Sequence, residues 1–366
     1  MSTVYDGEKG EFVAPEETGT ETGPLLEVKD LRVEFRTGDG VASVLNGVSY
    51  HVNAGETLAV LGESGSGKSV TAQTIMGILD IPPAVVLGGE VRFHGEELLK
   101  AKPARRMEVR GEGIAMIFQD ALSALNPVFT VGFQIEEQLR VRRGMSKADA
   151  RKRAIELLDL VKIPNAKGRV RNYPHEFSGG MRQRAMIAMS LALDPELLIA
   201  DEPTTALDVT VQAQIMDLLR EIQRERDMGL ILITHDLGVV AEVADRIAVM
   251  YAGRIVEQAD VFSLFRNPAH PYTEALLQSL PRLDLKGQEL KAIKGLPPSL
   301  ANIPSGCPFN PRCPRAVDRC KQEIPEFSAL DGDRYSACHF AEEVLVSGYG
   351  SSNPANHSRG VTRGDS

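Results

Sequence analysis

The sequence predicts an α/β fold: a parallel β-sheet that carries a phosphate-binding loop, followed by a small C-terminal extension. Three observations indicate this. A glycine-rich loop lies between a strand-like apolar run and a helix-like segment. Other short apolar runs end in polar residues, which is typical of buried parallel strands. All four cysteines gather in one late segment, beyond these runs.

The glycine-rich loop is the most informative stretch. The apolar run Leu58 to Leu61 precedes it, and Ile75, Met76 and Leu79 follow at helical spacing. Between them, the pattern G-x-x-x-x-G-K-[ST] is matched by Gly62, Glu63, Ser64, Gly65, Ser66, Gly67, Lys68 and Ser69. Glycines let backbone N–H groups converge on phosphate oxygens, and the helix N-terminus adds partial positive charge. We expect Lys68 to reach the β- and γ-phosphates of ATP and Ser69 to ligate Mg²⁺.

A second strand-like run, Leu197 to Ala200, ends in Asp201 and Glu202. An acid at such a strand end fits the Mg²⁺-holding carboxylate of phosphate-loop enzymes, which assigns that role to Asp201. Glu202 then faces another direction and can polarise the attacking water as general base. The alternative is a pair of solvated acids before a proline turn, which the apolar run disfavours.

Three further features are weak when taken singly. Gln119 and His235 follow strand-like runs, where such side chains are more often surface or packed residues. Ser178, Gly179 and Gly180 precede an apolar-periodic helix, so they form either a simple N-cap or a second anion site.

Together and in this order, these motifs resemble the ATP-binding-cassette (ABC) family, over roughly Leu25 to Ala259. The resemblance implies a signature motif at Phe177 to Met181, a Q-loop at Gln119 that touches Mg²⁺ or water, and a switch histidine at His235. It further implies a D-loop ending at Asp208 and adenine stacking by Phe35. Met181 stands where the family usually has Gln, and we expect the phosphate-contacting residues before it to keep their function. Family members pair, so Ser178 should act on the ATP of a partner cassette.

Three stretches narrow the resemblance to one branch. "DALSALNPVFTVGFQI", "NPAHPYTEALLQSLP" and "GLPPSLANIPSGCPFNPRCP" are similar to ATPase subunits of bacterial oligopeptide, dipeptide and nickel importers, most of all the D-type subunit of peptide permeases. The resemblance then covers about Leu25 to Phe340. It implies a second related ATPase, two transmembrane permeases, an extracellular peptide-binding protein and a peripheral place on the cytoplasmic face of the bacterial cell membrane. Nickel or glycoside import, or a non-transport role as a soluble ABC ATPase, are the alternatives.

The composition is typical of a globular protein without a transmembrane segment. The 366 residues contain 43% hydrophobic and 25% charged residues, and no window approaches the roughly 18 apolar residues of a span. The first residues are polar and acidic, unlike a secretory signal. The net charge of −9 disfavours nucleic-acid binding.

The expected organisation has four parts. Residues 1–24 read as a disordered tail and 25–260 as the nucleotide-binding domain, with a helix-rich insert at about 113–189. Residues 261–345 form the extension, and 346–366 a second disordered tail. Within the extension, Pro271 near a first helical turn indicates a helix start more than a regulatory site.

The cysteines have the spacing Cys307-x5-Cys313-x6-Cys320-x17-Cys338. In a reducing cytosol such a group favours metal or cluster ligation over disulfides. Four thiolates can hold zinc or a [4Fe–4S] cluster, although zinc sites more often show C-x2-C pairs. Unliganded packing cysteines are the alternative. Similar motifs in peptide-permease ATPases imply the [4Fe–4S] cluster first and zinc second, in a structural or regulatory role.

Overall fold

The structure is a computed structural model that describes residues 4–6, 11–13, 23–38, 40–120, 124–205, 207–279 and 293–347. The tails expected at 1–24 and 346–366 lie mostly outside these ranges. None of the helices within the described ranges is long and apolar enough to cross a membrane.

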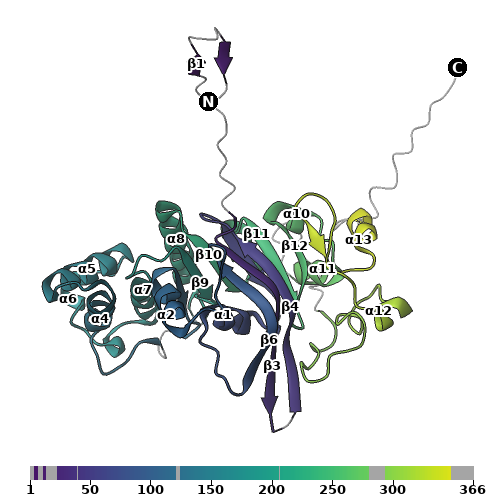
Figure 1. The fold of residues 1–366 in the computed structure, drawn as a ribbon, viewed down its shortest axis with the longest axis horizontal. Helices are drawn as coiled ribbons and strands as arrows, with labels where there is room; N and C mark the ends of the chain where they lie inside the picture. The colour runs from purple at the N-terminus through teal and green to yellow at the C-terminus, as the bar shows by residue number, and fades with distance from the viewer. Residues whose placement is uncertain are drawn as a thin grey trace.

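Two sheets form the framework (Figure 1). One has eight strands in the order β13-β14-β12-β11-β5-β10-β9-β8, and the other has four strands in the order β4-β3-β6-β7. A separate two-stranded pair joins β1 and β2. The strands are β1 (Val4–Asp6), β2 (Glu11–Val13), β3 (Leu26–Thr37), β4 (Gly40–Val52), β5 (Thr57–Leu61), β6 (Ala84–Phe93), β7 (Glu96–Glu97), β8 (Ile114–Ile117), β9 (Leu197–Asp201), β10 (Gly229–Thr234), β11 (Arg246–Tyr251), β12 (Arg254–Asp260), β13 (Ser328–Ala329) and β14 (Tyr335–Ser336).

The helices lie around and beyond these sheets. A short 3₁₀ turn at Pro174–Glu176 precedes α7. The described helices are α1 (Lys68–Met76), α2 (Pro103–Glu112), α4 (Val131–Arg143), α5 (Lys147–Leu160), α6 (Ala166–Arg169), α7 (Gly179–Ser190), α8 (Val209–Arg226), α9 (Leu237–Val243), α10 (Val261–Arg266), α11 (Pro271–Gln278), α12 (Asp318–Gln322) and α13 (Ala341–Ser347).

The apolar runs of the sequence become neighbouring parallel strands. β11, β5, β10, β9 and β8 pair in parallel, so their carboxyl ends meet at one edge of the sheet. The strand β8 lies within the stretch expected to be a helix-rich insert, yet it pairs with β9 and belongs to the sheet. The helices α4, α5, α6 and α7 follow this strand within the stretch.

Burial on both faces explains why these strands read as continuous apolar runs. On β5, Leu58 and Val60 pack into the core shared with the antiparallel sheet and α1. Ala59 and Leu61 face the opposite core, which is built with α9, α10 and α11. Successive strand side chains point to opposite faces, so a strand covered on both sides has no polar positions.

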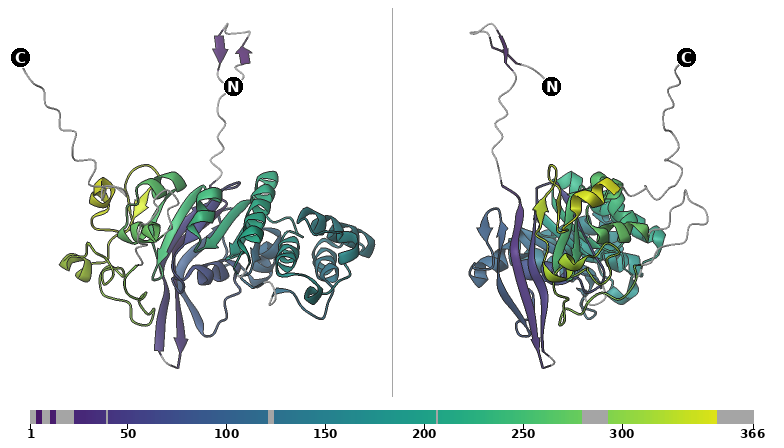
Figure 2. Two further views of the ribbon diagram at one scale, coloured as in Figure 1. Left: turned by 180° about the vertical axis from the view of Figure 1, so that it is seen from behind. Right: turned by 90° about the vertical axis from the view of Figure 1, so that its right-hand side faces the viewer.

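The helical region and the C-terminal extension lie at opposite ends of the molecule. Figures 1 and 2 show α4, α5 and α6 at one end and α12 and α13 at the other, with the sheets between them. The extension joins the sheet through β14, which pairs antiparallel with β12. It therefore packs against the body of the nucleotide-binding fold, close to β5 and its loop.

Candidate nucleotide site

The phosphate loop connects β5 to α1, as the sequence predicts. Two glycines are required by its geometry. A Cβ on Gly62 would lie 2.2 Å from the backbone oxygen of Met250, and Gly67 has a φ of +107° at the helix N-cap. The loop is thus pressed against β11 while its backbone turns into the helix, which leaves N–H groups facing outward for an anion.

Lys68 is folded back over the loop. Its Nζ donates to the carbonyl oxygens of Gly62 at 2.8 Å and Glu63 at 3.1 Å. Burial lowers the pKa of this amine, while the nearby carboxylates of the site oppose the shift. The hydroxyl of Ser66 is buried without a hydrogen-bond partner among the described residues. A buried polar group without a partner is costly, so this hydroxyl is available to a phosphate oxygen.

Ser69 and Asp201 meet across the two strand ends. The Ser69 hydroxyl donates to Asp201 Oδ1 at 3.1 Å, although the residues are 132 positions apart. Burial raises the pKa of Asp201, and the hydrogen bond from Ser69 acts against that rise. A hydroxyl and a carboxylate side by side are oxygen ligands of the kind Mg²⁺ prefers.

Glu202 is the centre of a second polar cluster. Its carboxylate accepts from Gln119 Nε2 at 3.1 Å and from the Thr205 hydroxyl at 2.9 Å, and lies 3.5 Å from His235 Nδ1. The backbone at Glu202 is left-handed, with φ of +45°. Glu202 and Asp201 have different hydrogen-bond partners, since Asp201 accepts from Ser69. Gln119 contacts Glu202, and its expected contact with Mg²⁺ stays a prediction.

Thr205 is a member of this cluster that the sequence analysis missed. It lies three residues after Glu202, at the spacing of one turn. The repeated threonine in "DEPTT" was the only signal for it, and either threonine fits that pattern.

The signature residues lie in the helical region. Ser178 caps α7 by accepting a hydrogen bond from Met181 N at 3.4 Å, and Asp208 caps α8 in the same way at 2.9 Å from Val211 N. A Cβ on Gly180 would lie 2.8 Å from Val211, so the two helix starts are neighbours. No hydrogen bond among the described residues joins this surface to the phosphate loop. Ala206, the first residue of the expected D-loop, lies outside the described residues.

A cavity of about 330 Å³ lies beside the loop, between Glu63–Ser66 on one side and Pro297–Ala301 of the extension on the other. Ala42 also lines it and is the cross-strand neighbour of Phe35, which is partly buried on β3. Phe35 therefore lies close to the rim of this cavity, although it is not among the residues that line it.

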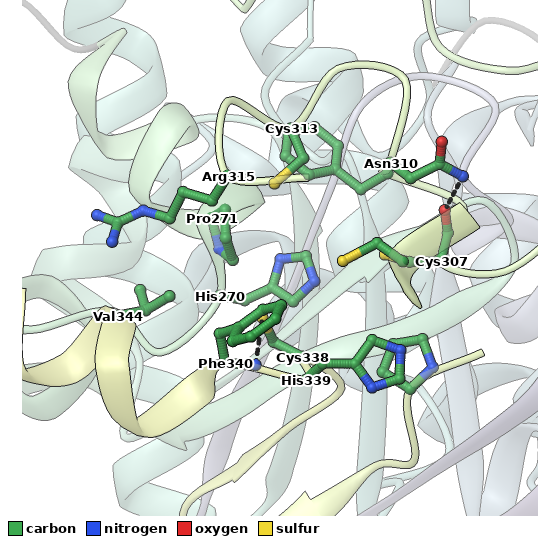
Figure 3. Close-up of a pocket in the computed structure, with 13 residues that line it drawn as sticks. His270, Pro271, Cys307, Asn310, Cys313, Arg315, Cys338, His339, Phe340 and Val344 are labelled. Atoms are coloured by element: carbon green, nitrogen blue, oxygen red, sulfur yellow. Dashed lines mark hydrogen bonds between the residues drawn. The ribbon is translucent and has the colours of Figure 1, made fainter. Parts of the chain in front are cut away.

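The four cysteines lie around a second cavity, in the extension. All are free thiols, and together with apolar groups they enclose a space of about 20 Å³. Figure 3 shows the side chains of Cys307, Cys313 and Cys338 converging near the ring of His270. The backbone N–H of Cys307 donates to the carbonyl of Cys320 at 2.8 Å, which brings the two cysteine segments together.

The arrangement of these thiols does not by itself support a metal ion. Among the described residues, no group of three or more His, Cys, Asp or Glu side chains is placed to hold one. Burial, with the neighbouring cysteines as a smaller contribution, raises the pKa of Cys307 to about 11 and that of Cys338 to about 12. These thiols are therefore protonated at neutral pH unless a cation compensates their charge. The extension therefore contains the four thiols expected for a metal site, but among the described residues they are not arranged as they would be around a bound ion.

The fold and the phosphate loop identify the class of protein. Residues 45–205 match the family model described as "ABC transporter". A dimeric bacterial ABC transporter cassette, MJ0796, superimposes with a TM-score of 0.58 at 28% identity, covering 64% of this chain and 98% of that one. The structure of cbiO1 from Clostridium perfringens, part of the ABC transporter complex cbiONQ, gives a TM-score of 0.57 at 29% identity over 66% and 90% of the two chains. The protein is an ABC-type ATPase.

The C-terminal extension identifies the branch of this family. Residues 256–320 match the family model "Oligopeptide/dipeptide transporter, C-terminal region". The oligopeptide transport ATP-binding protein OppD of Salmonella typhimurium is 51% identical over 88% of this chain and 95% of its own length. The dipeptide transport ATP-binding protein DppD of Bacillus subtilis is 52% identical over 88% and 98%. The chain belongs to the family of ATP-binding subunits of oligopeptide and dipeptide transporters.

Proposed function

We propose that this protein hydrolyses ATP to power import of oligopeptides or dipeptides through separate membrane permease subunits. The observation that carries the proposal is the combination of two features in one chain. The phosphate loop lies beside the Ser69–Asp201 pair and the Glu202 cluster, and the C-terminal region matches the oligopeptide and dipeptide transporter family. The names of the relatives at 51% and 52% identity support the same cargo class.

Within this proposal, each polar group of the site has a role. Lys68 binds the β- and γ-phosphates, Ser69 and Asp201 hold Mg²⁺, and the loop Gly62–Gly67 cradles the phosphates. Glu202 orients and deprotonates the attacking water, since a carboxylate is a suitable base and is already held by neighbouring donors. Gln119 and His235 both contact this base; His235 contacts the γ-phosphate, and Gln119 relays hydrolysis to the membrane subunits.

The signature supports a paired arrangement. Ser178, Gly179 and Gly180 start a helix beside the start of α8, which Asp208 caps, and no hydrogen bond among the described residues joins them to the phosphate loop of the same chain. In the proposed assembly, these signature residues complete the ATP site of a second, related ATPase subunit. The signature residues of that subunit in turn complete the ATP site of this chain. Two permeases and an extracellular peptide-binding protein make up the rest, and the chain lies peripherally on the cytoplasmic face of the membrane.

The domain organisation that we propose is the one expected from the sequence, and the two family models match residues 45–205 and 256–320. Residues 25–260 form the nucleotide-binding domain, with its helical part within 113–189, and residues 261–345 form the extension. Other cargoes, such as nickel or glycosides, remain the competing version of this function, because cargo is chosen outside this chain.

The test of cargo uses the assembled transporter in liposomes with its binding protein. ATP hydrolysis is expected to rise when a mixture of di- to pentapeptides is supplied outside, and labelled peptide should accumulate inside only with ATP. Nickel and glycosides serve as the controls. Stimulation by either of these, with no response to peptides, contradicts the proposed cargo while leaving the ATPase intact.

The cysteine cavity offers four sulfur donors. Four thiols face one space, but they are not gathered around a single point. We infer that this set binds a [4Fe–4S] cluster, for which the side chains have to move apart, with zinc as second choice. A cluster here would supply positive charge that stabilises the thiolates and would hold the cysteine segments together.

Anaerobically purified protein tests this. We expect a brown colour, a broad absorption band near about 400 nm and stoichiometric iron and sulfide. The variant Cys313→Ser should lose the band, whereas Ser305→Ala, in the same loop, should keep it. Colourless protein that contains zinc reverses the order of the two choices, and protein with neither metal contradicts both.

A further inference from the structure

The phosphate-loop residue Glu63 is held at three points. Its carboxylate accepts two hydrogen bonds from Arg312, at 2.5 Å from Nη1 and 2.9 Å from Nη2. Its backbone N–H donates to the hydroxyl of Tyr272 at 3.0 Å, and its carbonyl accepts from Lys68 Nζ. Arg312 and Tyr272 both belong to the C-terminal extension, far along the chain from the loop. The extension therefore fixes the side chain and the backbone of a residue that must present N–H groups to phosphate.

Arg312 is itself held rigidly. Its side chain is 5% exposed, and its Nε donates to the carbonyl of Lys294 at 3.2 Å. The guanidinium lies over the ring of Tyr251, 5.9 Å from the centroid, and Nη1 donates to the Tyr251 hydroxyl at 3.3 Å. A bidentate arginine on a carboxylate fixes direction as well as distance, which a lysine cannot do.

The position of Arg312 depends in turn on the cysteine segment. It immediately precedes Cys313 and lies five residues after Cys307. Between them, Phe309 is fully buried and packs on Tyr251 and Tyr272 with ring centroids 5.3 Å apart in both pairs. A continuous set of contacts thus runs from the cysteine cavity through Phe309 and Arg312 to the phosphate loop.

A buried ion pair can also serve only to dock the extension. In this pair, however, Glu63 lies within the phosphate loop, and its backbone carbonyl accepts a hydrogen bond from Lys68 Nζ. The extension also borders the cavity beside the loop through Pro297–Ala301. We propose that Arg312 is a positioning residue for ATP binding: by holding Glu63 it keeps the phosphate loop in its binding form, so the cysteine-bearing extension sets the affinity for ATP. The proposal relies on the ATP site described above.

The test compares Arg312→Met with wild-type protein and with Arg319→Met, which removes an exposed arginine of the same extension, paired with Glu323. We expect Arg312→Met to weaken binding of Mg·ATP by the full chain, and to raise KM for ATP in the assembled transporter, by about tenfold. The value of kcat should change by less than about twofold, because the water-activating groups are untouched. Arg312→Lys should recover part of the loss, and Arg319→Met should match wild type.

A double variant separates positioning from direct contact. If Arg312 acts through Glu63, then Arg312→Met should have little further effect on ATP affinity once Glu63→Met is present. An equal loss in both backgrounds means that Arg312 contacts the nucleotide itself, which overturns the proposal. A lower melting temperature with unchanged ATP affinity also overturns it, since the pair then only docks the extension.

If Arg312→Met does not fold, Glu63→Gln provides the test. This variant must raise KM for ATP, and an unchanged KM refutes the proposal. Wild-type protein without ATPase activity refutes the proposed function instead.

Discussion

Replacing Glu202 with glutamine is expected to slow ATP hydrolysis by about 10²-fold at the site that contains it, through loss of the general base. Glutamine keeps the size of the side chain and an oxygen that can accept from Gln119 or Thr205. It cannot take a proton from water. Affinity for Mg·ATP should stay within a few-fold of wild type, because Lys68, Ser69 and Asp201 are unchanged.

Steady-state phosphate release by the assembled transporter measures this effect. Turnover should fall to about half if the partner cassette works independently, and much further if the two sites are coupled. The matched control is Glu196→Gln, an acid at the other end of β9 that is 56% exposed and pairs with His94. The control should hydrolyse ATP at the wild-type rate. Full turnover by Glu202→Gln would remove Glu202 from the role of base.

The sequence predicted the parts of the site that follow strands. Leu58 to Leu61 and Leu197 to Ala200 are apolar on both faces, and a run of this kind is typical of a parallel strand that is covered on both sides. The strands β5 and β9 are parallel with β10 between them, so their carboxyl ends lie at the same edge of the sheet. Ser69 and Asp201 were assigned to Mg²⁺ separately, and the structure brings them within hydrogen-bond distance although they are 132 residues apart.

The contacts made by the extension could not be predicted in the same way. Pro271 indicated a helix start, and α11 does begin there, with His270 Nδ1 accepting from Tyr272 N at 3.0 Å. Nothing local, however, shows that the Tyr272 hydroxyl reaches Glu63 or that Arg312 does so too. Such contacts depend on how β14 docks against β12, and that docking is a tertiary property with no periodic signal. The extent of α7 is a smaller case: apolar residues continue to Leu193, but the helix ends at Ser190.

Truncating Glu257 to alanine is expected to destabilise the protein by about 3–5 kcal/mol. Glu257 lies on β12 with no exposed surface, and burial raises its pKa. Its carboxylate accepts from the backbone N–H groups of Ala269 at 2.7 Å and His270 at 2.9 Å, and from Arg334 Nη2 at 3.1 Å. Alanine leaves two buried N–H groups and a nearly buried guanidinium without this partner. The melting temperature should fall by roughly 10 °C for a domain of this size.

Thermal unfolding of the full chain, with the exposed-pair variant Glu323→Ala as control, measures the loss. The control should shift stability by less than about 1 kcal/mol, since exposed ion pairs contribute little. Combining Glu257→Leu with Arg334→Leu should be less destabilising than Glu257→Ala, because no buried charge is then left unpaired. If the Glu257→Ala protein has the melting temperature of wild type, this carboxylate does not hold β12 to the start of α11 and to the loop before β14. The anchoring of Tyr272 would then have to come from its other contacts, which include the packing on Phe309 and the hydrogen bond of its hydroxyl with Glu63 N.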